Sequence, residues 1–263
     1  MSVLAPRRTR RAPTPSVTTA VLGVAAAAWV GVVVSHTGGT PHAHHADAPA
    51  DVAALLTTLA GWALMVLAMM LPPALPLVGL LRALLSRRGH VAWRLAVALA
   101  AFVGVWLAVG VVLVTGGFVI ETVLSGSVAP ATHLRVAGGL VVLAGAYQFT
   151  PVKNACLTAC RTPRWFALRF WGRRSPTLDA ATVASAYGVS CVGCCWALML
   201  LCLGTGALAL PVMVVLTAVM AAERLVPRAH VIARTTGVVL LLLGTALLAG
   251  FLPPALVHPL LGA

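Results

Sequence analysis

Long apolar segments dominate the chain and constrain its fold more than any other feature. A run of about 20 apolar residues is enough to cross the hydrocarbon core of a bilayer as a helix. Such runs recur at residues 17–34, 52–81, 91–114, 133–150, 184–222 and 231–252. The run at 184–222 is too long for one crossing, so we expect two short helices that turn near "GTGALALP" (204–211). The sequence therefore predicts an all-α, polytopic membrane helix bundle with about seven transmembrane helices.

Basic residues stand in short blocks between the apolar segments. The formal net charge is +13, yet only 9% of the residues are charged, and the arginines form no stripe of the kind that binds nucleic acid. Basic loops of membrane proteins are enriched on the cytoplasmic side. If "RRTRR" (7–11) is cytoplasmic and each segment crosses once, except that 184–222 crosses twice, Arg135 is the one lysine or arginine outside. We therefore expect a multi-pass protein of the bacterial inner (cell) membrane with a cytoplasmic N-terminus, the lipid bilayer as partner and no nucleic acid.

Four regions are expected along the chain. They are a basic cytoplasmic tail (1–16), a first membrane segment (17–34), a His-rich outer loop (35–51) and a membrane domain (52–263). The first segment also resembles a secretory signal, but its apolar core of about 17 residues exceeds the usual length of about 7–15. We favour a retained anchor, and cleavage would leave six crossings. Aromatic and arginine residues in the inner loop, 151–177, predict a short helix at the membrane interface.

Cysteines are concentrated around the predicted fifth crossing. All six lie in the inner loop or on the helix that follows it. Residues advance by about 100° each along a helix, so "CVGCCWALMLLC" (191–202) places its sulfur residues on less than half of the circumference: Cys191, Cys194, Cys195, Met199 and Cys202. Cys156 and Cys160 are four residues apart and are neighbours if the inner loop is helical. The sequence therefore predicts a group of thiols near the inner side of the membrane.

Methionines add a second group of sulfur residues. Met65, Met69 and Met70 precede Pro72 and Pro73, which disrupt the second membrane segment. Their depth is similar to that of the central cysteines, so the two groups are able to converge. The candidate metal ligands are Cys191, Cys194, Cys195, Cys156, Cys160, Met69, Met70 and Met65, with Met199 and Cys202 as weaker candidates.

The donor types point to a soft metal. Thiolate and thioether ligands select Cu(I), which makes copper the favoured ion. Zinc is the alternative, with four thiolates from Cys156, Cys160, Cys191 and Cys194, and an iron–sulfur cluster is a third option. The competing interpretation is side-chain packing, because cysteine behaves as a small hydrophobe and methionine as a gap filler. Packing is favoured for Met199 and Cys202. It is disfavoured for the triplet at 191–195, since three clustered thiols are an oxidation risk.

The outer loop carries weaker metal candidates. His42, His44 and His45 lie near Asp47 and Asp51, and imidazole and carboxylate bind Cu(II), Zn(II) or Ni(II). A solvated linker is the favoured interpretation, because the tract is short and irregular. Glu223, at the inner end of the sixth crossing, is expected to pair with Lys153, Arg161 or Arg224.

Four stretches of the sequence, in this order, resemble successive signatures of a known family. They are "MVLAMMLPP" (65–73), "YQFTPVKNACLTACRTP" (147–163), "GVSCVGCCWALML" (188–200) and "VMAAERLVP" (219–227). The chain resembles the bacterial predicted metal-binding integral membrane proteins, a family of unknown function whose members are sometimes labelled copper chaperones. The resemblance covers residues 52–250 and implies metal binding by the cysteines at 156, 160, 191, 194 and 195, with Met69 and Met70. Arg224 departs from the family pattern, in which lysine follows the glutamate, but its charge is kept.

Three functions are compatible with these observations. The favoured one is an integral membrane protein that binds Cu(I) and delivers it to a copper-dependent membrane or exported protein. The first alternative is a thiol redox or electron relay protein, for which the C-x-x-C spacing of Cys191 and Cys194 is suitable. The second is a non-catalytic subunit that stabilises a partner. An enzyme is not favoured, since no Ser-His-Asp set, phosphate loop or dinucleotide fingerprint is found.

Overall fold

The chain folds into α-helices in every part that the structure, a computed structural model, describes. Described are residues 15–37, 52–124, 130–203 and 209–251. The first helices are α1 (Pro15–Thr37), α2 (Val52–Met70), the short 3-10 turn η1 (Pro72–Ala74), α3 (Leu75–Leu85) and α4 (Val91–Leu124). They are followed by α5 (Pro130–Tyr147), α6 (Pro151–Arg161), α7 (Pro163–Phe170), α8 (Pro176–Leu203), α9 (Ala209–Leu225) and α10 (Ala229–Leu248). The prediction of an all-α helix bundle is confirmed.

Five of these helices are long and apolar enough to cross a membrane: α1, α2, α4, α8 and α10. They match five of the predicted crossings. The other two predicted crossings correspond to α5 and α9, which are shorter. Large apolar side chains such as Val30, Val112 and Leu242 are exposed on the outer faces of the bundle. Exposed apolar faces of this extent are expected where lipid, rather than water, surrounds the helices.

Prolines mark the beginnings and breaks of the helices. A proline at the first helical position has no N–H to leave unsatisfied and its φ already suits a helix. Helices begin in this way at Pro15, Pro130, Pro151, Pro163 and Pro176. Pro72 and Pro73 have the opposite effect on the second segment, because α2 ends at Met70 and the chain continues through η1 into α3. The predicted disruption at these prolines is confirmed, and Met70 thereby becomes the last residue of α2.

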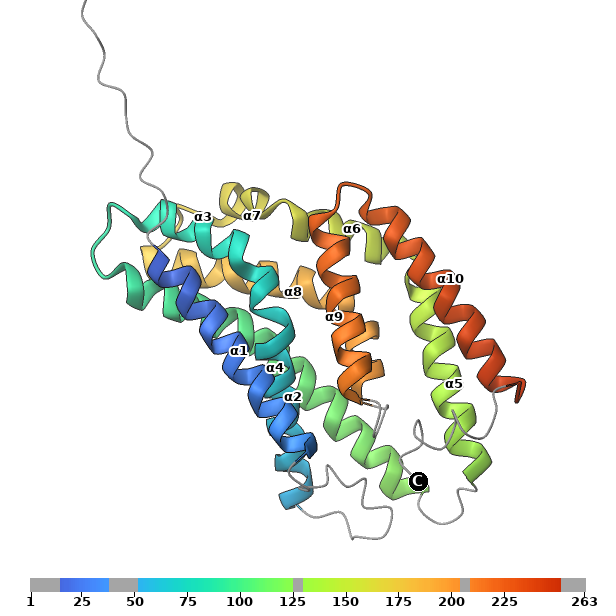
Figure 1. Cartoon of the computed structure of the whole chain (residues 1–263). Helices are drawn as coiled ribbons and strands as arrows, with labels where there is room; N and C mark the ends of the chain where they lie inside the picture. Colours follow the sequence, from blue (N-terminus) through green and yellow to red (C-terminus); the bar gives the residue numbers. More distant parts are fainter. Residues whose placement is uncertain (1–14, 38–51, 125–129, 204–208, 252–263) are drawn as a thin grey trace, which may run out of the picture.

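Helix α8 is the central element of the bundle. In an apolar stretch of 18 residues, 56% of α8 is buried, against 22% to 28% of the corresponding stretches in the other four long helices. Helices α4, α6, α7 and α9 all contact it. The short helices α3, α6 and α7 lie along one end of the bundle (Figure 1). Helices α6 and α7 are the helical structure predicted for the inner loop, and they place its cysteines against α8.

Helices α5 and α10 lie side by side and approach each other closely (Figure 1). A Cβ atom added to Gly145 would lie 2.9 Å from the backbone nitrogen of Leu241 and 3.0 Å from the carbonyl oxygen of Gly237. A Cβ on Gly244 would lie 2.8 Å from the nitrogen of Val142. Small residues at such positions let membrane helices pack backbone against backbone. These glycines therefore fix the distance between α5 and α10.

Replacement of Gly145 by alanine is expected to destabilise the protein. The new methyl group would meet backbone atoms, which cannot move away as a side chain can, and overpacking of this kind costs about 1–3 kcal/mol. The melting temperature of the detergent-solubilised protein should fall. Gly139→Ala is the matched control, because nothing lies within 4 Å of a Cβ at Gly139 of the same helix. Equal melting temperatures for the two variants would contradict this account of the helix pair.

Candidate functional site

Three cysteines of α8 form the centre of the candidate site. Cys191, Cys194 and Cys195 have relative exposures of 0%, 1% and 2%. The carbonyl oxygen of Cys191 accepts hydrogen bonds from the thiols of Cys194 at 3.1 Å and Cys195 at 2.9 Å. The helical spacing of these residues therefore gathers their three sulfur atoms on one buried face, as predicted.

Helix α6 adds a fourth thiol to this face. The Sγ atoms of Cys160 and Cys194 are 3.8 Å apart. Thr150 caps the beginning of α6 by accepting a hydrogen bond from the backbone N–H of Lys153, and Pro151 occupies its first position. The hydroxyl of Tyr187, one turn before Cys191 on α8, donates to the carbonyl oxygen of Cys160 at 3.2 Å. Tyr187 thereby holds the end of α6 that carries Cys160.

The end of α2 contributes a thioether. The Sδ atom of Met70 lies 4.0 Å from the Sγ of Cys191 and 3.9 Å from that of Cys195. Sulfur ligands bonded to a metal at about 2.3 Å lie about 3.8–4.0 Å apart in tetrahedral or trigonal arrangements. The observed separations agree with this spacing. We call Met70, Cys160, Cys191, Cys194 and Cys195 the sulfur cluster.

Helix α9 places a guanidinium group against the sulfur cluster. The Nη2 atom of Arg224 lies 3.0 Å from the Sγ of Cys191, 3.5 Å from that of Cys194 and 3.7 Å from that of Cys195. Hydrogen bonds from a charged donor are stronger than neutral ones. The arginine therefore supplies positive charge at the point where the three α8 thiols meet.

A buried ion pair joins α6 to α9 beside the cluster. The Nζ atom of Lys153 lies 2.7 Å from Oε2 of Glu223, and the two side chains are 0% and 2% exposed. Arg161 donates to the carbonyl oxygens of Glu223 at 2.8 Å and Val226 at 2.6 Å, at the end of α9. Such carbonyls have no partner within their own helix. The predicted pairing of Glu223 is confirmed, with Lys153 as its partner.

The two thiols of α6 have raised pKa values. Hydrogen bonds with Cys191 and Cys194, together with burial, hold the pKa of Cys160 well above its usual range. Burial is also the main cause of the raised pKa of Cys156. Both thiols therefore keep their protons near neutral pH.

The other sequence-predicted ligands lie outside the sulfur cluster. The Sγ of Cys156 packs against Gly193 of α8, where an added Cβ would lie 2.5 Å from it. Met65, Met69, Met199 and Cys202 are buried in the apolar core. The Cys202 thiol faces the carbonyl oxygen of Leu198, 3.8 Å away and within its own helix. His42, His44 and His45 fall outside the described residues. Within the described ranges, no three or more His, Cys, Asp or Glu residues form a group that could hold a metal ion by themselves, so a metal at the sulfur cluster would need the Met70 thioether or a rearrangement of the thiols.

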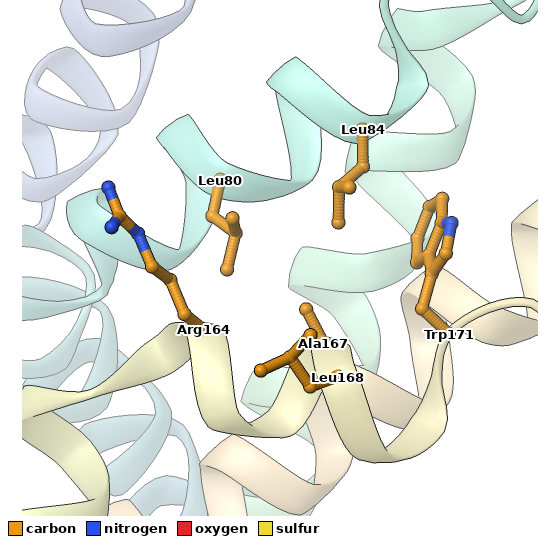
Figure 2. Close-up of a pocket in the computed structure, with 6 residues that line it drawn as sticks. All are labelled: Leu80, Leu84, Arg164, Ala167, Leu168 and Trp171. Atoms are coloured by element: carbon orange, nitrogen blue, oxygen red, sulfur yellow. The ribbon is translucent and has the colours of Figure 1, made fainter.

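A pocket of about 380 Å³ lies elsewhere, between α3 and α7. Figure 2 shows Leu80 and Leu84 of α3 facing Ala167 and Leu168 of α7, with Arg164 and Trp171 at the edges. Its lining contains no cysteine, methionine or histidine. This pocket is therefore not the candidate metal site.

Sequence reasoning missed two residues of the site. Arg224 is expected from the sequence only as one of three candidate partners of Glu223, and its position beside Glu223 at the end of an apolar helix was the one signal that it belongs to a charge network at the site. Tyr187 gave no signal, because its partners, the carbonyl oxygens of Cys160 and Pro73, come from distant parts of the chain. Both residues matter through contacts that form only when the helices are assembled.

Comparison with protein families gives one match. A family model described as "Copper chaperone" matches residues 59–247, which include every residue of the sulfur cluster and Arg224. The chain matches none of the curated proteins and none of the solved structures compared with it.

Replacement of Lys153 by methionine is expected to destabilise the protein strongly. It would leave the Glu223 carboxylate buried without its cation, and breaking a buried ion pair costs about 3–5 kcal/mol. Thermal unfolding in detergent measures the loss. The double variant Lys153→Met, Glu223→Leu should recover most of the stability, because an apolar pair of similar volume replaces the charges. A double variant no more stable than the single one would argue against the ion pair as the cause.

Proposed function

Because the chain belongs to a copper chaperone family, we propose that it binds Cu(I) in the sulfur cluster and delivers the ion to a partner protein. The observation that carries the proposal is the convergence of four thiols and one thioether from α2, α6 and α8. Sulfur atoms of different helices lie 3.8 Å (Cys160 and Cys194) to 4.0 Å (Met70 and Cys191) apart. Soft donors of both kinds together are the set that selects Cu(I).

The favoured location is the bacterial cell membrane. The distribution of basic residues supports a cytoplasmic N-terminus and a cytoplasmic position for the loop that contains α6 and α7. In this orientation the sulfur cluster is near the cytoplasmic ends of its helices. The proposed partner is a copper-dependent membrane or exported protein. Because the cluster is buried, copper transfer requires α6, which carries Cys160, to move away from α8.

Zinc remains the alternative ion. A structural zinc site usually needs four ligands arranged as a tetrahedron. The four cysteines that the sequence offers for it include Cys156, whose sulfur packs against Gly193. The contacts of Met70 with Cys191 and Cys195 also favour copper, since thioethers are soft ligands.

Thiol redox chemistry is the second candidate function. The specific observation in its favour is the 3.8 Å separation of the Sγ atoms of Cys160 and Cys194. A disulfide between them would need a sulfur–sulfur distance of about 2.05 Å, which a modest shift of α6 provides. Copper binding is preferred because it uses Met70 as well, and a thioether has no part in dithiol–disulfide exchange.

Replacement of Cys191, Cys194 and Cys195 by serine is expected to abolish copper binding. Protein purified without oxygen should retain about one Cu(I) per chain, because soft thiolates bind it, whereas hydroxyl groups are hard and poor ligands. Metal analysis of both proteins measures the difference. Cys202→Ser is the matched control, since its thiol lies on the same helix but outside the sulfur cluster. Unchanged copper content in the triple variant would overturn the proposal.

Thiol trapping in cells distinguishes copper binding from a redox relay. For a copper site we expect Cys160 and Cys194 to remain reduced in cells treated with a mild oxidant or reductant, as cytoplasmic thiols usually are. A maleimide reagent of known mass, added after denaturation in acid, counts the free thiols. A population that alternates between disulfide and dithiol with the treatment would favour the relay instead.

A further inference from the structure

Arg224 forms no ion pair with a carboxylate among the described residues. The nearest acid in sequence, Glu223, forms its ion pair with Lys153. The contacts of the Arg224 guanidinium are instead the three sulfur atoms of Cys191, Cys194 and Cys195. Its Nη1 atom is buried and has no hydrogen-bond partner in the described part of the chain. The protein therefore leaves part of this cation unsatisfied, directly beside the sulfur cluster.

A charge in apolar surroundings is costly unless an opposite charge accompanies it. Neutral thiols supply hydrogen-bond acceptors for Arg224 but no negative charge. A counter-charge arises when sulfur loses its proton, and metal binding drives that loss. The state of the site that suits Arg224 best is therefore one in which metal and sulfur together carry one negative charge.

The charge of the loaded site depends on the metal. When two cysteines bind one Cu(I), both thiol protons leave, and the complex carries one negative charge. Two cysteines with one Zn²⁺ release the same two protons and give a neutral complex. The thioether of Met70 changes neither sum. With Arg224 included, the Cu(I) site is neutral, whereas the Zn²⁺ site keeps the one positive charge that the metal-free site already has.

We propose that Arg224 determines the metal preference of the sulfur cluster by neutralising the anionic complex of Cu(I) with two thiolates, a stabilisation that the neutral complex of Zn²⁺ with the same thiolates does not receive. This inference rests on the proposed function, since it assumes that the cluster binds metal. It goes further by giving the selection for a monovalent ion to a residue that is not a ligand. Arg224 is thus a positioning and specificity-determining residue.

The test compares the Cu(I) and Zn²⁺ affinities of full-length protein in detergent without oxygen. Each ion is titrated against a coloured or fluorescent chelator of known affinity. Arg224→Gln should lower the Cu(I) affinity about 100-fold or more, the effect of removing one member of a buried charge pair. The same variant should bind Zn²⁺ with about the wild-type affinity, because a neutral complex of Zn²⁺ with two thiolates leaves the net charge of the site as it is without metal. A general loss of structure would lower both affinities and cannot produce this selective change.

Three further variants complete the experiment. Arg224→Lys keeps the charge and should keep the preference for Cu(I). Arg228→Gln removes the same charge from an exposed residue between α9 and α10. Its affinities for both ions should match those of the wild type. Arg224→Leu replaces the guanidinium by an apolar side chain and gives the same measurement if the glutamine variant does not fold.

Two results would overturn the inference, and they are distinguishable. If the wild type binds Cu(I) and neutral variants at position 224 keep its ratio of Cu(I) to Zn²⁺ affinity, Arg224 does not set the preference, although the proposed function stands. If the wild type binds no Cu(I), the proposed function itself fails.

Discussion

The constraint on which the site depends is the placement of charge in an apolar bundle. Two cations, Arg224 and Lys153, lie close to one buried carboxylate, Glu223. Glu223 and Arg224 are consecutive, so their side chains leave α9 about 100° apart and face different neighbours. Glu223 faces Lys153 of α6, and Arg224 faces the thiols of α8. This division ties α6 to α9 through one ion pair and gives the second cation to the sulfur cluster.

Helix α8 brings the remaining parts of the site together. It carries the three central thiols, and its Tyr187 hydroxyl lies close to carbonyl oxygens of both α6 and η1. Its Gly193 leaves room for the Cys156 side chain of α6. Since α2 ends at Met70 before Pro72, this thioether comes from a helix terminus. Ligands held on helices rather than on loops are well ordered, and here three helices and the end of a fourth enclose one group of sulfur atoms.

Burial of the cluster has a consequence for the proposed delivery of copper. The four cysteines are 0–4% exposed, so the proposed capture or release of an ion needs a movement of the helices that enclose them, such as α6, which packs against α8. The contacts that hold α6 there are identifiable: the Lys153–Glu223 pair, the Arg161 hydrogen bonds to the end of α9, and Tyr187. All three involve α6, one of the short helices at one end of the bundle (Figure 1). A partner that receives copper would have to approach this end, where α6 and α7 are accessible.

The sequence by itself determined the fold class and most of the candidate ligands. Apolar runs predict helices wherever they are long, because a bilayer leaves the backbone no other partner than itself, and the 3.6-residue period puts Cys191, Cys194 and Cys195 on one face. Only the tertiary structure decided which distant groups meet them. It brought Met70 but not Met65 or Met69 to the thiols, and Cys160 but not Cys156, because these choices depend on how the helices rotate and pack. It also placed Arg224, one of three candidate partners of Glu223, against the sulfur cluster. A charge pattern indicates on which side of a membrane a charged residue lies. The group that this residue contacts is decided by the packing of helices that are far apart in the sequence.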